Sequence, residues 1–258
     1  MIVAVALGGV PDVGRGDDLA ALLAAATASA SGGASGASGM RYRAGDVLVV
    51  AHKAVSKAEG RTVALDGVKP GTRAIALAAE HGKDARVVEV VLGESEEIVR
   101  SRPGVLICRT RHGFICANAG VDASNAPGGE LVLLPEDPDA SARALRARLR
   151  ELTGVAPAIV IADSFGRAWR VGQCDVAIGV AGLTVLEDWR GRSDGAGRVL
   201  DATVIAVADE AAAAADLARS KDSREPAVLV RGLERHVGED DGPGAAALVR
   251  ARAEDLFL

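Results

Sequence analysis

The chain is organised around one stretch, AIVIADSFGR, at residues 158–167. Its first five residues are apolar without a break, which predicts a fully buried strand over 158–162 that ends at Asp163. The stretch DVLVVA at residues 46–51 predicts another strand. Helical patterns lie between the strand patterns without a regular strand–helix alternation. We therefore expect an α+β fold with mixed sheets and packed helices, neither Rossmann nor TIM barrel; two intertwined subdomains fit this pattern.

Other segments predict further helices and strands. The residues around position 138 predict a helix, because Asp137 fits the cap, Pro138 the first helical position and Gly154 the C-terminal cap. Its apolar stripe consists of Leu145, Leu149 and Leu152. Further helices are predicted at 19–26, 72–81, 85–100 and 203–219. Further strands are predicted at 2–7, 105–109, 113–116, 131–134, 176–180 and 227–230.

Composition limits the function classes. The 258 residues are 49% hydrophobic and only 2% aromatic, with a formal charge of −5. A chain of this length buries a large core, which excludes disorder of the whole chain. The negative charge and the few rings argue against a protein that coats nucleic acid or an anionic membrane. The Ser/Gly tract at 29–39 predicts a flexible surface insertion within one domain over residues 1–258.

Cysteine usage and the chain's start bear on localisation. The 3 cysteines lack C-x-x-C spacing, which indicates neither a disulfide scaffold nor a zinc module and fits a reducing compartment. Residues 1–8 lack the basic region of a signal peptide, and no apolar run reaches the roughly 18 residues of a membrane span. We expect a cytoplasmic protein without nucleic-acid or membrane partners.

Two polar segments follow apolar strands. Residues 117–125, ANAGVDASN, gather amide, carboxylate and hydroxyl groups around a glycine, which suits either a ligand loop or a self-satisfied turn. Asp163 and Ser164 offer two oxygen ligands of the kind that Mg²⁺ and Mn²⁺ prefer, although an aspartate there could also cap a turn. If Asp122 lies near Asp163, two carboxylates from separate segments converge on one cation.

Basic residues mark two more segments. The chain has five lysines, and two of them, Lys53 and Lys57, lie together in HKAVSKAEGR at residues 52–61, where they suit phosphate contact. No Walker A motif and no convincing G-x-G-x-x-G occur, so a nucleotide pocket is of an uncommon kind. Arg167 and Arg170 either hold an anionic substrate or form a solvated loop. His81, His112 and His236 show no metal-ligand spacing.

Together these segments resemble the coenzyme F420-0:L-glutamate ligases, also called F420:γ-glutamyl ligases. The likeness runs through GGVPDVGRGDDLAALL, GDVLVVAHKAVSKAEGR, RPGVLICRTRHGFICANAGVDASN and IVIADSFGRAWRVGQCDVAIGVAGL, and more weakly to EDLF. Some relatives continue into a flavin-binding domain, so the resemblance implies the single-domain form. It also implies a GTP-dependent amide ligase: GTP phosphorylates the lactyl carboxylate of F420-0, and the amine of L-glutamate attacks the acyl phosphate. GDP and phosphate leave, and later rounds add γ-linked glutamates.

The resemblance also implies which residues bind what. The divalent cation, Mg²⁺ or Mn²⁺, is expected at Asp122, Asp163 and Ser164. GTP is expected at Val10, Pro11, Asp12, Val13, His52, Lys57 and Asn125. Potassium and a homodimer are implied as well, whereas the group that deprotonates the attacking amine is not identified.

Two departures from the family pattern leave alternatives open. His52 stands where the family usually carries a small hydroxyl residue, and residues 220–226, SKDSREP, replace a glycine-richer, often acidic loop. One alternative is a nucleotide- or cofactor-binding homologue with altered catalysis. The other is the same ligase chemistry on a different acid acceptor.

Overall fold

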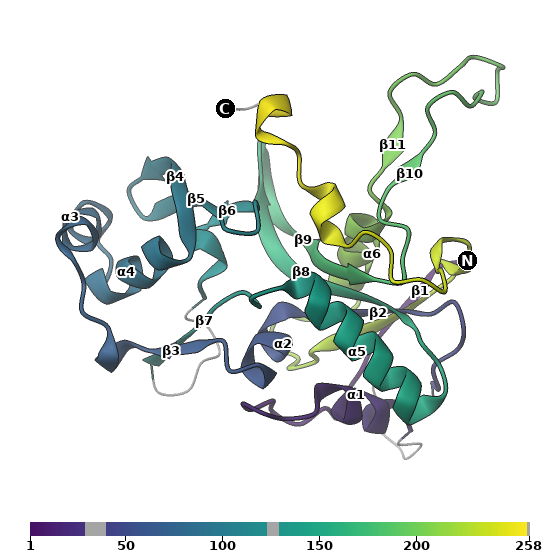
Figure 1. Ribbon diagram of the computed structural model, residues 1–258, viewed down its shortest axis with the longest axis horizontal. Helices are drawn as coiled ribbons and strands as arrows, with labels where there is room; N and C mark the ends of the chain where they lie inside the picture. The colour runs from purple at the N-terminus through teal and green to yellow at the C-terminus, as the bar shows by residue number, and fades with distance from the viewer. Residues whose placement is uncertain (29–39, 123–128, 257–258) are drawn as a thin grey trace.

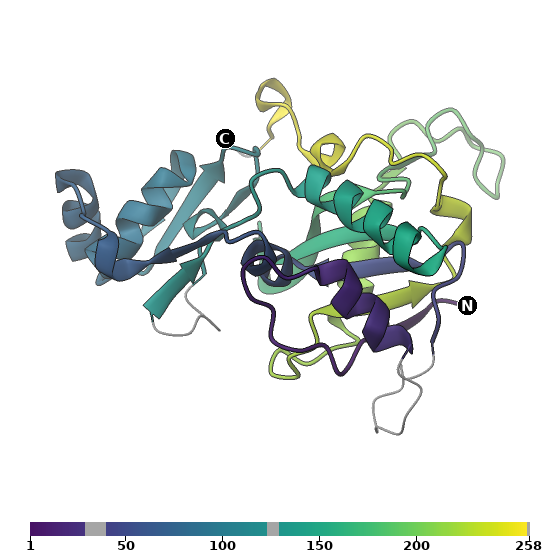
Figure 2. The same cartoon turned by 60° about the horizontal axis from the view of Figure 1, so that its bottom comes forward.

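The main body is a five-stranded sheet between two layers of helices (Figures 1 and 2). The computed structural model describes residues 1–28, 40–122 and 129–256, so the Ser/Gly tract at 29–39 and Asn125 lie outside the described residues. Every pairing in this sheet is antiparallel except that of β2 with β8. The strand order is β1 (Val3–Ala6), β12 (Ala227–Arg231), β2 (Val47–Ala51), β8 (Ala158–Arg167) and β9 (Arg170–Ala181).

Both faces of the sheet are covered, which is why its central strands read as continuous apolar runs. Side chains of a strand alternate between faces, so Val47 and Val49 point toward α6 (Val207–Asp216), and the alanines of α6 allow close packing there. Leu48 and Val50 belong to the cluster on the opposite face. The helices of that face are α1 (Leu19–Ala28), α2 (His52–Ala58) and α5 (Pro138–Thr153).

Helix α5 has the ends that the sequence predicted. The Asp137 side chain accepts a hydrogen bond from the backbone N–H of Ala140, with Pro138 in the first turn. Gly154 ends the helix with a left-handed φ of 76°, which glycine adopts without a Cβ clash. Leu145 and Leu149 are buried as expected, but Leu152 is exposed, because the sheet lies under only part of the stripe.

A smaller lobe is built from the chain between α2 and α5 (left in Figure 1). Its cluster of buried side chains is separate from the two clusters of the main body. The C-terminal segment returns to this lobe, where Arg252 bonds to Glu97 and Asp255 lies 3.7 Å from Arg109. The lobe contains α3 (Thr72–His81), α4 (Ala85–Gly93), β3 (Thr62–Ala64) paired with β7 (Glu130–Val132), and a sheet of β4 (Ser95–Arg102), β5 (Val105–Thr110) and β6 (Ile115–Ala117).

The α+β class with mixed sheets is therefore confirmed, and the interleaving of the two parts comes from the returning C-terminal segment. A two-stranded arm of β10 (Glu187–Asp188) and β11 (Val204–Ile205) projects from the body (Figure 1). The short 3-10 turns are η1 (Leu65–Gly67), η2 (Asn118–Gly120), η4 (Glu234–His236), η5 (Ala245–Leu248) and η6 (Arg252–Glu254).

The predicted helix over 85–100 is wrong in its second half. Helix α4 ends at Gly93, and the residues from Ser95 form β4, which pairs antiparallel with β5. Valines and isoleucines spaced for a helix also suit a strand, and long-range pairing with β5 decided between the two. The predicted helix over 203–219 is likewise shorter, because its first residues form β11.

The prediction that the strand ends at Asp163 is also wrong. β8 continues to Arg167 because β9 pairs with it as a two-stranded ribbon beyond the sheet. The pairing of β8 with β2 nevertheless stops at Ala162, so Asp163 is the first residue past the parallel pair.

Two further sequence predictions concern cysteines and membranes. Cys108 and Cys116 are buried free thiols and Cys174 is partly buried, in line with the expectation of no disulfide scaffold. No helix within the described ranges is both long and apolar enough to cross a membrane.

Gly179 of β9 provides a test of how closely α5 is set on the sheet. A Cβ at this position would lie 2.3 Å from the carbonyl oxygen of Pro138, so Gly179→Ala forces the start of α5 away. We expect a loss of about 1–3 kcal/mol in the free energy of unfolding, measured by urea denaturation. Gly195→Ala in the arm is the matched control, because its Cβ meets nothing within 4 Å. Equal stability of the two variants would contradict this packing.

Candidate functional site

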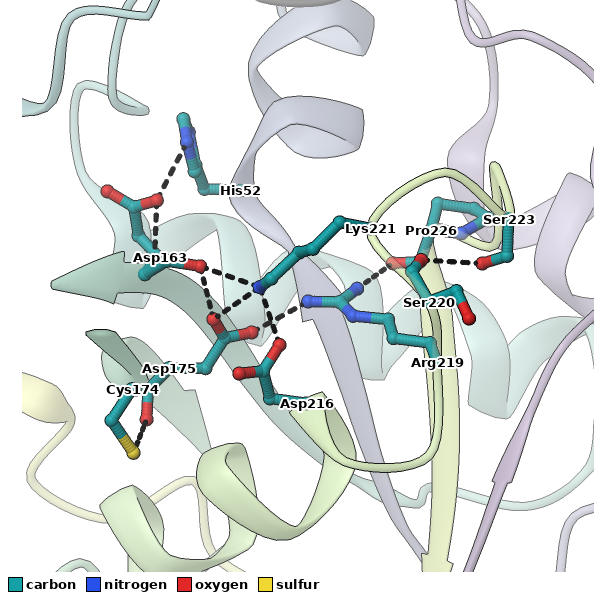
Figure 3. Close-up of polar contacts among 11 residues, drawn as sticks. His52, Asp163, Cys174, Asp175, Asp216, Arg219, Ser220, Lys221, Ser223 and Pro226 are labelled. Carbon is teal, nitrogen blue, oxygen red and sulfur yellow. Dashed lines mark hydrogen bonds and ion pairs between the residues drawn. The ribbon is translucent and has the colours of Figure 1, made fainter. Parts of the chain in front are cut away.

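The parallel pairing of β2 and β8 brings the first two site segments together. Ala51 pairs with Ala162, so the residues that follow, His52 on α2 and Asp163 on β8, emerge side by side. His52 is 2% exposed, and its Nε2 lies 3.3 Å from Oδ1 of Asp163 (Figure 3). The same Oδ1 accepts a hydrogen bond from the backbone N–H of Ser164. The carboxylate is thus fixed at the carboxyl end of the parallel strand pair, where ligands of α/β sheets commonly bind.

Asp122 reaches the same place from the smaller lobe. Its backbone forms two hydrogen bonds with Val132, and its Oδ2 lies 2.5 Å from Nζ of Lys53. Consecutive residues of α2 therefore contact the two carboxylates among the three predicted metal ligands, His52 at Asp163 and Lys53 at Asp122. The structure places both aspartates at the first turn of α2.

A strained turn leads into Asp122. Asn118 and Ala119 have left-handed φ values of 51° and 53°, which cost non-glycine residues about 1–2 kcal/mol each. Two contacts hold the turn: Oδ1 of Asn118 accepts from Nζ of Lys83, and Ala119 is buried. Burial lowers the pKa of this lysine, and nearby Cys108 opposes this shift. Strain of this kind is often found where a side chain must be aimed.

Of the predicted nucleotide residues, His52 begins α2, and the others that the structure describes lie near the other end of this helix. Lys57 is in the last turn of this helix. The loop that contains Val10, Pro11, Asp12 and Val13 follows β1, and its Gly16 donates a hydrogen bond to the carbonyl of Ala58. Val10 and Val13 pack against the core, so side chains of this loop anchor it while its backbone remains near α2. The assignment of these residues to GTP stays a prediction, and so does that of Asn125, outside the described residues.

The structure adds a cluster of charges that the sequence analysis missed. Asp175 of β9 is 1% exposed, and its Oδ1 accepts a hydrogen bond of 2.5 Å from the Ser164 hydroxyl. Its Oδ2 accepts from the Arg219 guanidinium at 2.8 Å. Lys221 places its ammonium 2.9 Å from Oγ of Ser164, 3.4 Å from Asp175 and 2.5 Å from Asp216 (Figure 3). Ser164, a predicted metal ligand, is therefore oriented by the carboxylate of Asp175 and the ammonium of Lys221.

Two signals could have indicated this cluster. Lysine is rare in the chain, so Lys221 carries more information than a lysine usually does. It also lies in residues 220–226, the segment that departs from the family pattern and to which no role was assigned. Asp175, by contrast, is marked only by its cross-strand pairing with Ser164, which depends on the register of β8 and β9.

The protonation states around Ser164 follow from these contacts. Burial acts to lower the pKa of Lys221, but hydrogen bonding to Asp216 and the charge of Asp175 raise it above its ordinary value. The ammonium therefore stays charged at neutral pH. On the other side of Asp163, burial and then the negative charge of Asp163 raise the pKa of the Cys116 thiol to about 12. This thiol stays neutral, which excludes it as a nucleophile.

The segment with Arg167 and Arg170 forms the tip of the β8–β9 hairpin. Trp169 at the turn has a φ of 63° and is 85% exposed. Arg167 donates to the carbonyl of Val171, which closes the turn. Both arginines are exposed, so this hairpin is charged and solvated; anion binding there stays a prediction.

The donor set at the sheet edge fits a divalent cation. Asp122, Asp163 and Ser164 offer oxygen atoms, and the buried Nε2 of His52 has no hydrogen-bond partner among the described residues. The described ranges contain no group of three or more His, Cys, Asp or Glu side chains arranged to hold a metal by themselves. Mg²⁺ does not need such a group, because it commonly uses one or two carboxylates with water and substrate phosphates.

Comparison with known proteins gives the same family over most of the chain. The model of the F420-0:gamma-glutamyl ligase family matches residues 9–232. A protein of Methanopyrus kandleri, named coenzyme F420:L-glutamate ligase, is 47% identical over 244 residues, which cover 94% of this chain and 92% of the relative. Relatives of the same name are 43% identical in Methanothermobacter thermautotrophicus, covering 96% of both chains, and 44% identical in Archaeoglobus fulgidus, covering 87% of this chain and 85% of the relative.

Arg219 and Lys221, which both form ion pairs with Asp175, are expected to contribute differently to stability. Arg219 is nearly buried against the buried Asp175, so Arg219→Met leaves this carboxylate only its longer ion pair with the exposed Lys221 and costs about 3–5 kcal/mol. The Lys221 side chain is 66% exposed, so Lys221→Met costs at most about 1 kcal/mol. Urea denaturation of both variants tests this order. A larger loss for Lys221→Met would mean that the lysine, not the arginine, holds Asp175.

The raised pKa of Cys116 predicts a stability loss at high pH. The folded state keeps this thiol protonated up to about pH 12, whereas the unfolded chain releases the proton near the ordinary pKa of 9.0. The contribution is therefore full below pH 9 and declines as the pH rises toward 12. Cys116→Ala should make the decline of unfolding free energy above pH 9 shallower by up to about 1.4 kcal/mol per pH unit. Identical pH profiles for wild type and variant would contradict the assignment.

Proposed function

This chain belongs to the F420-0:gamma-glutamyl ligase family, and we propose that it is a GTP-dependent ligase that joins L-glutamate to coenzyme F420-0 and then adds γ-linked glutamates. The observation that carries this proposal is the meeting of two segments at α2. His52 and Lys53, consecutive in sequence, contact Asp163 from the body and Asp122 from the smaller lobe. The two carboxylates expected to bind one cation are thus neighbours of the same helical turn.

The chemistry requires activation of a carboxylate, which is a poor electrophile. The γ-phosphoryl group of GTP is transferred to the lactyl carboxylate of F420-0, forming an acyl phosphate and GDP. The amine of L-glutamate attacks the acyl carbon, the C–N bond forms, the C–O bond to phosphate breaks, and inorganic phosphate leaves after the amine has lost a proton. The site's task is to hold both reactants in line and to stabilise phosphate charge.

A bound Mg²⁺ or Mn²⁺ supplies neutralisation of the phosphate charge in this proposal. Asp122, Asp163 and Ser164 are the residues that would hold it. The hydroxyl of Ser164 donates to Asp175 and accepts from Lys221, which leaves one of its two lone pairs for a further partner. Asp175 and Lys221 are therefore positioning residues, because each fixes the direction of the Ser164 lone pair.

The local charge balance supports binding of the cation together with the nucleotide. Four aspartates of the site (Asp122, Asp163, Asp175 and Asp216) are matched by three bases (Lys53, Arg219 and Lys221). A site with this small surplus of negative charge attracts a free divalent ion only weakly. A triphosphate adds the missing negative charge and offers further oxygen ligands.

The remaining roles complete the proposal. His52, Lys57, Asn125 and the loop containing Val10, Pro11, Asp12 and Val13 bind GTP. Lys57 presents a compact positive charge to a phosphate, and the loop supplies backbone groups. The potassium ion and the homodimer that the family resemblance implies are part of the same proposal.

The direct test is a ligase assay on the purified chain. F420-0, GTP, Mn²⁺ and L-glutamate are incubated with the protein, and the product is followed by mass spectrometry. A gain of one glutamyl unit with stoichiometric GDP is expected. If folded protein gives no gain with F420-0 but does with another acid, the acceptor assignment is wrong; GTP binding without any turnover would favour the catalytically altered homologue.

Asp163→Asn tests the role of the site carboxylate. The substitution keeps the shape of the side chain and removes its charge, so we expect the ligase rate to fall at least about a hundredfold at an unchanged melting temperature. Asp66→Asn is the matched control, because Asp66 is a fully exposed carboxylate of the smaller lobe. Turnover of the Asp163 variant at the wild-type rate would exclude this site as the catalytic one.

A further inference from the structure

The histidine at the start of α2 has one ring nitrogen that the fold does not satisfy. His52 is 2% exposed, and no group within the described residues forms a hydrogen bond with its Nε2. The nearest carboxylate oxygen, Oδ1 of Asp163, is 3.3 Å away (Figure 3). An unsatisfied polar atom in a protein interior is unfavourable. Nδ1 of His81 and Nδ1 of His112 are also unsatisfied among the described residues, but the nitrogen of His52 is the one that faces a predicted metal ligand.

The other ring nitrogen has a partner within the same helix. Nδ1 lies 3.4 Å from Oγ of Ser56, one turn further along α2, and Ser56 is completely buried. When Nδ1 donates its hydrogen to Ser56, Nε2 carries a lone pair and faces the carboxylate. Metal-bound histidines show this arrangement, in which the second nitrogen donates to a hydroxyl or carbonyl that fixes the ring.

The distance between Nε2 and Oδ1 suits two ligands of one ion. At metal–ligand distances of about 2.1–2.3 Å, neighbouring ligands of an octahedral ion lie about 3.0–3.3 Å apart. The measured separation of 3.3 Å falls at the upper end of this range. In the tautomer with its hydrogen on Nδ1, the lone pairs of Nε2 and Oδ1 face each other and repel, and a cation between them would turn this repulsion into two bonds.

We propose that His52 is a nitrogen ligand of the divalent cation that Asp163 binds. This inference rests on the divalent-metal part of the proposed function and adds a residue and a selectivity to it. Imidazole suits transition metals, whereas Mg²⁺ favours an all-oxygen shell. With His52 in the shell, the site prefers Mn²⁺ to Mg²⁺.

Each of the chain's other histidines has its Nε2 bonded away from the site. Nε2 of His81 bonds to Ser101 in the smaller lobe, and Nε2 of His112 lies 3.0 Å from the carbonyl of Pro135. Nε2 of His236 accepts from Arg235 near the base of the arm. A spectroscopic signal from a metal-bound histidine therefore has one expected source, and His236→Gln is a suitable control variant.

Pulsed electron paramagnetic resonance of Mn²⁺ tests the bond itself. The full chain is prepared with ¹⁵N-labelled histidine in otherwise ¹⁴N protein and is loaded with Mn²⁺, alone and with GDP. The guanine nitrogens stay ¹⁴N, so a ¹⁵N coupling reports histidine only. We expect the coupling of a directly bound imidazole in the wild-type chain and in His236→Gln, and its loss in His52→Gln.

Metal affinity gives a second, independent measure. His52→Gln replaces the nitrogen with an amide whose oxygen suits Mg²⁺, so we expect the affinity for Mn²⁺ to fall about tenfold and that for Mg²⁺ to change less than about threefold. Titration of Mn²⁺ and competition by Mg²⁺ measure both values, with His236→Gln unchanged. The wild-type spectrum alone remains decisive if the variant does not fold.

The outcomes separate this inference from the function on which it rests. Mn²⁺ that binds near the nucleotide without ¹⁵N coupling overturns the histidine ligand, makes His52 only a neighbour of Asp163, and leaves the ligase proposal standing. An equal loss of Mn²⁺ and Mg²⁺ affinity in His52→Gln overturns the selectivity. If the wild-type chain binds no Mn²⁺ with or without GDP, both the inference and the metal part of the proposed function are wrong.

Discussion

The parallel pairing of β2 with β8 is the constraint on which the site depends. In the main sheet these two strands run in the same direction, and their pairing ends at Ala51 and Ala162. His52 and Asp163 are in contact for that reason, although more than a hundred positions separate them in sequence. A slip of one residue in this pairing would turn the apolar side chains of one strand to the wrong face, so burial of both faces fixes the register. Packing of the core thus determines where His52 and Asp163 lie.

Sequence patterns predicted correctly those elements whose formation depends on residues close together in the chain. The cap at Asp137 and the left-handed Gly154 define α5 within its own sequence, and the apolar runs of β2 and β8 require burial whatever their neighbours are. Prediction failed where a distant partner decided the outcome. The segment from Ser95 became a strand because β5 pairs with it, and Asp175 joined the site because the β8–β9 register places it opposite Ser164. The resemblance named Asp122, Asp163 and Ser164, but nothing local marked Arg219 and Lys221 as their companions.

Most charged groups of the site are balanced by neighbours before any ligand is considered. Arg219 holds the buried Asp175, Lys221 lies on Ser164, and Lys53 lies on Asp122. Removing charges from water is costly, and each of these pairs offsets that cost for an acid. The pairing also limits what a ligand can gain, because an incoming cation must compete with an ammonium for the oxygen of Asp122. The same contacts therefore preorganise the site and limit its affinity for a cation.

The contact between Lys53 and Asp122 also joins the two parts of the molecule. Lys53 belongs to a helix that begins at the edge of the main sheet, whereas Asp122 is held by Val132 in the smaller lobe. The C-terminal segment makes a second connection through Arg109 and Asp255. Only the first connection lies at the site. In the proposed function, a phosphate that draws the ammonium of Lys53 toward itself would release the carboxylate of Asp122, and a cation bound by Asp122 together with Asp163 would re-form the link between body and lobe. In this arrangement, filling the site and holding the two parts together depend on the same carboxylate.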